Sequence, residues 1–164
     1  MEISLFTKCL FEFIGTLVLV LLGDGVVAST VLKRSKGFDG GWIVITIAWG
    51  LAVMCGVLIA GPYSGAHLNP AVSVGLAVAG SFPWAYVPGY VAAQLLGGFC
   101  GAVVVYLYYK DHFDATDDPA AKLGVFCTMP AIMDKPRNLF CEVVGTFLLV
   151  FVILAIGNEQ NTPE

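Results

Sequence analysis

Apolar residues dominate four long stretches of the chain, and polar residues collect in the segments between them. These stretches contain almost no ionisable side chain and cover residues 13–22, 42–60, 84–109 and 139–156. With its flanks, each stretch approaches or exceeds the roughly 17 to 25 residues that an α-helix needs to cross a bilayer. The pattern therefore predicts an all-α integral membrane protein with four transmembrane helices.

A shorter apolar stretch, 71–79, lies between the second and third of these helices. About nine helical residues rise only ~13.5 Å, which is too little to cross the bilayer. Asn69 suits an N-cap and Pro70 the first helical position, so we expect a half-helix over 69–79. Such a segment either re-enters the side of the membrane from which it came or lies on the surface.

The connections give weaker signals. The second helix is expected to end by Gly61–Pro62, because proline lacks an N–H donor and disfavours helix in the residue before it. The polar stretch 110–138 is expected to form a long external loop, and residues 158–164 a turn-forming tail that starts the following loop. Asp24 lies towards the far end of the first helix, where we expect an interfacial charge.

An internal repeat links the two ends of the sequence. The segment FEFIGTLVLV at 11–20 reappears as CEVVGTFLLV at 141–150, with Glu, Gly, Thr, Leu and Val in register. Three crossings separate the copies, so the second enters the membrane from the opposite face. An odd number of crossings between the copies predicts an inverted repeat, in which residues 1–109 form the first unit and residues 139–157 begin the second. Proteins with inverted repeats place the solute site where the two units meet.

Composition supports a membrane protein and excludes some partners. The 164 residues are 58% hydrophobic and 12% charged, whereas soluble domains carry roughly twice that charge fraction. The net charge is −4, and most of the charged residues of both signs lie in two connections, so no basic surface for nucleic acid is expected. The five cysteines form no C-x-x-C pair and suit packing as small hydrophobes. We expect no cofactor and no metal site.

The stretch SGAHLNPAV at 64–72 carries the candidate chemistry. In a soluble chain Asn-Pro would favour an ordinary turn, but irregular backbone inside a membrane persists only where protein or a water-filled cavity satisfies it. The carbonyls of Gly65, Ala66 and His67 would offer a ladder of acceptors, and the Asn69 amide a donor. The positive end of the half-helix dipole would oppose cations and protons. We therefore expect a pathway for small uncharged solutes.

These motifs resemble the major intrinsic proteins, the family of aquaporins and glycerol facilitators. The segment 12–16 is similar to the family's first-helix motif, 64–72 to its first Asn-Pro-Ala box, and 142–146 to its fourth-helix copy. The resemblance implies an aquaporin-like right-handed helical bundle with one pore per subunit and a homotetramer. The second Asn-Pro-Ala box, its arginine and the last two helices have no counterpart in 1–164, so we expect a truncated, incomplete channel domain.

The resemblance also implies roles for single residues. Glu12 and Glu142 would accept hydrogen bonds from the backbone of re-entrant loops, although carboxylates near helix ends can instead reach the interface. Pro70 and Ala71 would support the first box. Trp49 looks like the aromatic at the constriction of the glycerol branch, although it could simply pack between helices. The pore-lining candidates are Trp49, Gly65, Ala66, His67, Leu68 and Asn69.

Trp49 and the long connection 110–138 favour a glycerol facilitator that also passes water. A water-selective channel and a non-conducting fragment are the alternatives. An enzyme using His67 as a base is disfavoured, because no nucleophile or metal-ligand cluster lies at a usable spacing. We expect a multi-pass protein of the plasma (inner) membrane. The resemblance implies a cytoplasmic N-terminus. The distribution of basic residues favours the opposite orientation, because all of them except Lys8 follow the first helix.

Overall fold

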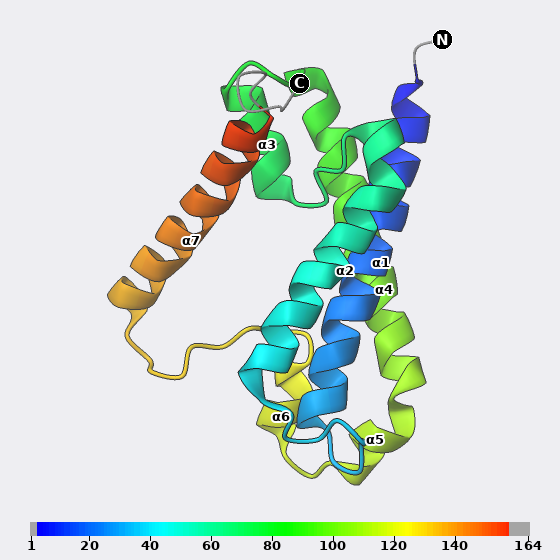
Figure 1. Cartoon of the computed structure of the whole chain (residues 1–164), viewed down its shortest axis with the longest axis vertical. Coiled ribbons are helices and arrows are strands. Elements are labelled where there is room, and N and C mark those ends of the chain that lie inside the picture. Colours follow the sequence, from blue (N-terminus) through cyan, green and yellow to red (C-terminus); the bar gives the residue numbers. More distant parts are fainter. Residues whose placement is uncertain (1–2, 158–164) are drawn as a thin grey trace.

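The computed structural model describes residues 3–157, in which every regular element is helical (Figure 1). The long helices are α1 (Leu5–Val31), α2 (Gly41–Ser64), α4 (Val87–Tyr108) and α7 (Lys135–Ile156). The shorter ones are α3 (Pro70–Val78), the 3₁₀ turn η1 (Trp84–Tyr86), α5 (Lys110–Ala115) and α6 (Pro119–Gly124). Within the described residues, four helices are long and apolar enough to cross a membrane, which confirms the predicted class. The predicted tail at 158–164 lies outside the described residues.

Helix α1 is the centre of a tight three-helix bundle and packs against both α2 and α4. Its contact with α4 depends on the absence of side chains at Gly97 and Gly101. A Cβ atom added to Gly101 would lie 2.7 Å from the carbonyl oxygen of Leu17, closer than van der Waals contact allows. The G-x-x-x-G spacing thus lets the two backbones touch, which is how helices without a hydrophobic driving force associate in lipid.

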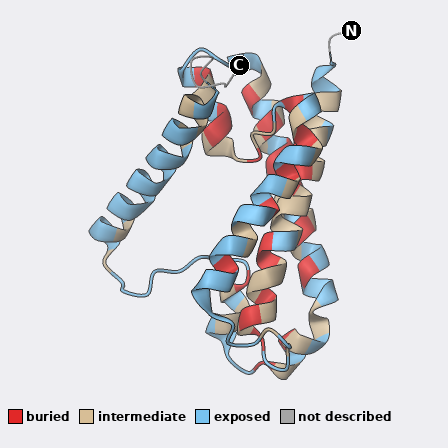
Figure 2. Cartoon of the chain, in the orientation of Figure 1, coloured by how far each residue is buried: buried red, intermediate tan, exposed pale blue. Residues whose placement is uncertain are grey.

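Helix α7 runs in the direction opposite to α1 and stands apart from the three-helix bundle (Figure 1). This is the orientation that an inverted repeat predicts for the second copy of the motif. The helix packs against α3, where Val150 fills the space above Gly75. None of its residues is buried, as Figure 2 shows. The opposite face of α7 is therefore free to meet lipid or other protein.

Two helix boundaries differ from the prediction. Helix α2 continues through Pro62 to Ser64, because Gly61 has no Cβ that would clash with the proline ring. The helix ends instead at Gly65, whose left-handed φ of +85° lets its N–H donate to the Gly61 carbonyl at 3.1 Å. Helix α7 begins before the apolar stretch, because Asp134 caps its N-terminus.

The stretch predicted as a long loop, 110–138, contains helix α5, which packs against α4, and helix α6, which packs against α1. Asp118 caps α6 and Pro119 occupies its first turn, a start signal that is readable in the sequence. Thr116 attaches this segment to the chain just after α1, because its Oγ1 accepts a hydrogen bond from the Lys33 N–H at 2.9 Å. A small core forms beneath, from Ala28, Leu32, Val105, Phe113 and Val125.

Candidate pore site

Helix α3 is a re-entrant half-helix. The chain leaves α2, dips towards the middle of the bundle in an irregular loop, and returns through α3 to the end from which it came (Figure 1). Asn69 is the N-cap, and its Oδ1 accepts from the Ala71 N–H at 2.8 Å. Pro70 fills the first position, where no N–H is needed. The Nδ2 donor of Asn69 has no partner among the described residues.

The loop before α3, residues 65–69, has an unusual backbone. Gly65, Ala66 and Leu68 all have positive φ values, of +85°, +50° and +53°. The left-handed conformation costs roughly 1–2 kcal/mol for a residue with a Cβ. Such a conformation persists only where the surroundings hold it in place. The hydrogen bonds that Glu12 accepts from the loop and the packing of the Leu68 side chain hold the loop in this conformation.

Glu12, on α1, is fully buried beneath this loop. Its Oε1 accepts from the Ser64 hydroxyl at 2.6 Å and the His67 N–H at 2.9 Å. Its Oε2 accepts from the Leu68 N–H and from the Gln94 Nε2, each at 2.8 Å. Four donors match the acceptor capacity of one carboxylate, so its burial leaves no lone pair unsatisfied.

The direction of these bonds fixes the direction of the loop carbonyls. In a trans peptide unit the C=O points opposite to the N–H of the next residue. Because the His67 and Leu68 N–H groups point at Glu12, the carbonyls of Ala66 and His67 point away from it. No described residue donates to the carbonyls of Gly65, Ala66 or His67. The loop therefore presents acceptors that only water or a solute can satisfy.

The Leu68 side chain anchors the loop between α1 and α2. It is 7% exposed, and it lies over Gly15 and Gly56. A Cβ atom at Gly15 would come within 2.6 Å of its Cδ2, and one at Gly56 within 2.8 Å of its Cδ1. Leu68 was a pore-lining candidate, but its side chain lies in the interface between α1 and α2.

The His67 ring lies in a scaffold behind the loop. Its Nδ1 is 2.9 Å from the Ser73 hydroxyl, and its ring packs edge-on against Phe82 with centroids 4.5 Å apart. Ser73 also accepts from Gln94 at 3.1 Å. The hydroxyl of Tyr90 donates to the Ser64 carbonyl at 2.8 Å. His67 therefore offers only its backbone carbonyl to the loop surface, while its ring contacts Ser73 and Phe82.

Sequence reasoning missed four residues of this scaffold: Ser64, Ser73, Tyr90 and Gln94. Gln94 had a signal, because it is the one amide side chain in the apolar stretch 84–109. A polar residue inside a membrane segment is a functional candidate by default. Ser64 opens the stretch 64–72, but its bond to Glu12 joins residues 52 positions apart and could not be foreseen. Ser73 and Tyr90 gave no separate signal.

Comparisons with known proteins identify the family of the chain. The whole chain, residues 1–164, matches the major intrinsic protein family. The chain belongs to this family. It is 57% identical to a probable glycerol uptake facilitator protein of Thermotoga maritima, over 92% of the chain and 64% of that protein. It is 52% identical to the glycerol uptake facilitator protein of Bacillus subtilis, over 92% of the chain and 55% of that protein.

A solved aquaglyceroporin from Plasmodium falciparum is also similar. The two share 39% sequence identity with a TM-score of 0.65, over 71% of this chain and 48% of the solved chain. The chain therefore spans somewhat under two thirds of the length of the first two relatives and about half of the solved structure.

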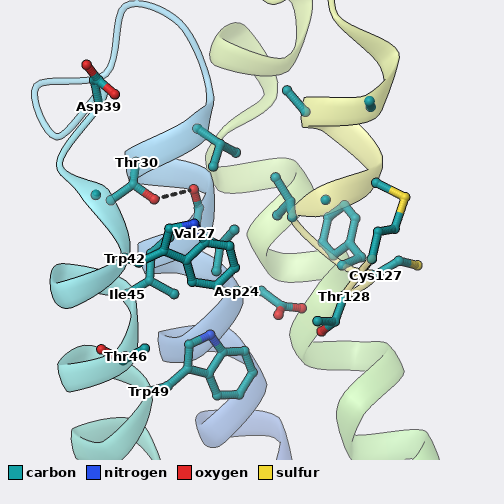
Figure 3. Close-up of a pocket in the computed structure, with 18 residues that line it drawn as sticks. Asp24, Val27, Thr30, Asp39, Trp42, Ile45, Thr46, Trp49, Cys127 and Thr128 are labelled. Carbon is teal, nitrogen blue, oxygen red and sulfur yellow. Dashed lines mark hydrogen bonds between the residues drawn. The ribbon is translucent and has the colours of Figure 1, made fainter. Parts of the chain in front are cut away.

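Two predicted site residues of this major intrinsic protein lie away from the loop. Trp49, on α2, packs against Gly23 and lines a cavity of about 850 Å³ between α1, α2 and the segment 120–129 (Figure 3). No residue of the 65–69 loop lines that cavity. Glu142 is exposed on α7, and its carboxylate has no hydrogen-bond partner within residues 3–157.

Asp24, for which we expect an interfacial charge, lines the same cavity and is 8% exposed. The segment 120–129 covers it, because α6 folds back against α1. The polar composition of 110–138 predicts an external loop and carries no signal for this cover.

Proposed function

We propose that this chain belongs to a passive transmembrane channel that conducts glycerol and also passes water. The observation that carries the proposal is the loop 65–69, whose free carbonyls lie beside an Asn69 amide with a free donor. The relatives named as glycerol uptake facilitators support glycerol as the solute.

The atoms of the loop suggest how a solute would pass. Hydroxyl groups of the solute would donate to the carbonyls of Gly65, Ala66 and His67 in turn, and would accept from Asn69. These contacts replace the hydration shell of the solute without forming a deep binding site. The N-terminus of α3 carries roughly half a positive charge, which opposes cations and protons. Small uncharged solutes would therefore be preferred.

Trp49 supports glycerol over water alone. Its half-buried indole lines the cavity, where it offers an apolar edge to the carbon chain of a polyol. A water-selective channel would have no use for such a surface. That alternative predicts water flux without glycerol flux.

A passive channel is favoured over a membrane enzyme. The ring of His67 is held by Ser73 and by the aromatic rings of Phe82 and Tyr90. The carboxylate of Glu12 accepts four hydrogen bonds already. Neither group is left free to transfer a proton to a substrate.

The assembly and the location are part of the proposal. The exposed apolar surfaces of α2 and α7 suit contact with lipid and with further copies of the chain in a homotetramer. We place the protein in the plasma membrane with the N-terminus in the cytoplasm. Labelling of Cys127, an exposed thiol after α6, tests the orientation. Reaction with an impermeant reagent added outside intact cells supports it, and reaction only after permeabilisation contradicts it.

Stopped-flow light scattering of proteoliposomes tests conduction. Vesicles that contain the 164-residue chain are challenged separately with a sucrose and a glycerol gradient. Rapid re-swelling in glycerol above empty vesicles would support a glycerol channel. Water flux without glycerol flux would favour the water-selective alternative. Background permeability to both solutes, from protein shown to be inserted, would favour a non-conducting fragment.

A further inference from the structure

Two buried polar atoms at the interface of α1 and α4 have no hydrogen-bond partner among the described residues. They are the hydroxyl oxygen of Thr16 and the side-chain carbonyl oxygen Oε1 of Gln94. Thr16 is 6% exposed and Gln94 is 2% exposed, so both groups lie inside the bundle. Leaving such groups unpaired is costly, and native proteins nearly always supply a partner from protein or from ordered water. Each of these atoms therefore needs a further partner.

The amide of Gln94 is oriented by its nitrogen. Nε2 donates to the Glu12 Oε2 at 2.8 Å and to the Ser73 hydroxyl at 3.1 Å. With the amide reversed, its oxygen would face the carboxylate of Glu12, and two acceptors would meet without a hydrogen between them. The Gln94 Oε1 therefore points away from Glu12. Because this oxygen can only accept, its partner must be a donor.

The hydroxyl of Thr16 is not used by its own helix. A threonine in a helix commonly donates to a carbonyl one turn back, and Thr30 on α1 does so with the carbonyls of Val26 and Val27. Thr16 makes no such bond. Its side chain faces α4, because its Cγ2 lies 4.0 Å from the position that a Cβ atom would take on Gly98. The hydroxyl is thus available as a donor beside α4.

Thr16 and Gln94 are separated by about one helical turn across this interface. Helices α1 and α4 run in the same direction (Figure 1), with Gln94 beside Glu12 and Gly98 beside Thr16. One turn of helix rises ~5.4 Å. A single water that bonds two oxygens at roughly 2.8 Å each spans up to about 5.6 Å, twice the reach of a direct bond. The separation therefore suits a bridging water.

The packing between the helices is looser next to Thr16 than one residue earlier on α4. A Cβ atom added to Gly97 would lie 2.4 Å from the Phe13 carbonyl oxygen, so the two backbones touch there. A Cβ atom added to Gly98 would meet no atom closer than 3.7 Å. Buried waters are held by two to four polar groups. The interface beside Gly98 thus has both polar groups and room for a small molecule.

We propose that one ordered water is bound between α1 and α4, where it accepts from the Thr16 hydroxyl and donates to the Gln94 Oε1. The water satisfies both atoms and holds the Gln94 amide in the orientation that places Nε2 on Glu12. Thr16 is then a positioning residue, which acts through the water and Gln94 on the carboxylate that orients the loop 65–69. The site goes beyond the proposed function, because it does not depend on which solute passes the loop.

Infrared spectroscopy of the Gln94 carbonyl tests the dependence on Thr16. The chain has two glutamines, Gln94 and Gln160, so Gln160→Asn leaves one glutamine carbonyl to label with ¹³C. The purified 164-residue Gln160→Asn protein is compared with its Thr16→Val and Thr16→Ser derivatives. Thr16→Val removes the hydroxyl at nearly constant shape, so the band should shift to higher frequency as Oε1 loses its donor. Thr16→Ser keeps the hydroxyl and should leave the band in place.

Thr30→Val is the matched control, because Thr30 is on the same helix, is 5% exposed and bonds only within α1. Its Gln94 band should match that of the parent. Thr16→Ala serves as a second variant if Thr16→Val fails to fold, and the same shift is expected. An unchanged band in a folded variant without the Thr16 hydroxyl would overturn the inference.

A crystal structure that resolves ordered waters distinguishes a bridging water from a direct bond. We expect an isolated density peak within hydrogen-bond distance of both the Thr16 Oγ1 and the Gln94 Oε1, and we expect the peak to be absent in Thr16→Val. A direct hydrogen bond between Thr16 and Gln94 would overturn the water site even if the infrared band shifts. The absence of a peak between the two oxygens in the parent would overturn it as well.

Discussion

Glu12 accepts a 2.8 Å hydrogen bond from the backbone N–H of Leu68, a residue 56 positions later in the chain. This bond and its neighbour from the His67 N–H turn the loop so that its carbonyls point away from α1. The short motif around Glu12 and the Asn-Pro-Ala box are thus one structural unit. A substitution in either part should therefore alter the structure of the other.

Removal of the Glu12 carboxylate should disorder the loop. Glu12→Ala leaves the N–H groups of His67 and Leu68 and the amide of Gln94 without their acceptor. Each buried unsatisfied donor costs about 1–3 kcal/mol, so the loss should reach several kcal/mol. Thermal unfolding in detergent should show a clearly lower midpoint, and glycerol flux should fall to background.

Glu142→Ala is the matched control for Glu12→Ala, because the sequence repeat places this glutamate at the equivalent position. Its side chain is exposed and has no partner within the described residues. The unfolding midpoint of the 164-residue chain should change little. A similar loss in both variants would show that the contacts of Glu12 do not stabilise the loop.

The side chain of Leu68 and the glycines beneath it should be strongly coupled. Gly15→Ala introduces a Cβ that would lie 2.6 Å from the Leu68 Cδ2, and overpacking of this kind costs about 1–3 kcal/mol. Leu68→Ala removes this contact, although the new Cβ still lies 2.9 Å from the Ala60 Cβ, so the double variant should be destabilised by less than the sum of the single effects. A double-mutant cycle on the unfolding midpoint measures the coupling. Additive effects would mean that the Leu68 side chain does not pack against Gly15.

His67→Ala should reduce glycerol flux only modestly. The side chain of His67 lies behind the loop, and the surface offered to the solute is backbone. Loss of its contacts with Ser73 and Phe82 should lower stability by about 1–3 kcal/mol. Flux per inserted protein, measured by stopped flow, should stay within a few-fold of the parent. Complete loss of function in a stably folded variant would instead support a chemical role for the imidazole.

Thr116→Val should loosen the segment that carries α5 and α6. The Thr116 hydroxyl accepts from the Lys33 N–H and donates to the His112 carbonyl at 2.7 Å, and it is almost fully buried. Loss of both bonds should cost about 1–3 kcal/mol and increase amide exchange over 110–126. Thr46→Val is the control, because this exposed hydroxyl bonds only within its own helix. Equal exchange in both variants would show that Thr116 does not hold the segment.

Local patterns in the sequence were enough to predict the four long helices and the half-helix. Apolar length identified the crossings, and Asn69 with Pro70 marked the start of α3. The path of α2 through Pro62 was not predictable from the proline alone, since the preceding Gly61 decides it. The helices α5 and α6 were missed because they are too short for a periodic pattern, although Asp118 and Pro119 marked one start.

The role of Glu12 followed from the family resemblance, and its hydrogen bonds with the His67 and Leu68 N–H groups agree with that role. The same resemblance implied an equivalent role for Glu142, which has no such partner within residues 3–157. The inward turn of the Leu68 side chain depends on glycines in two other helices, and the burial of Asp24 depends on the fold of 119–129. Such contacts join residues far apart in sequence, so no local pattern reveals them.

Chemical blockage of the loop 65–69 shows most directly whether this loop lines the solute pathway. Asn69→Cys places a thiol at the free amide position, and a water-soluble thiol reagent is added to proteoliposomes during stopped-flow glycerol measurements. Val78→Cys, on the same half-helix but 72% exposed in the chain, is the control. We expect the reagent to abolish glycerol flux in Asn69→Cys alone, and we expect glycerol to slow the labelling. Full labelling of Asn69→Cys with unchanged glycerol flux would contradict a pathway along this loop.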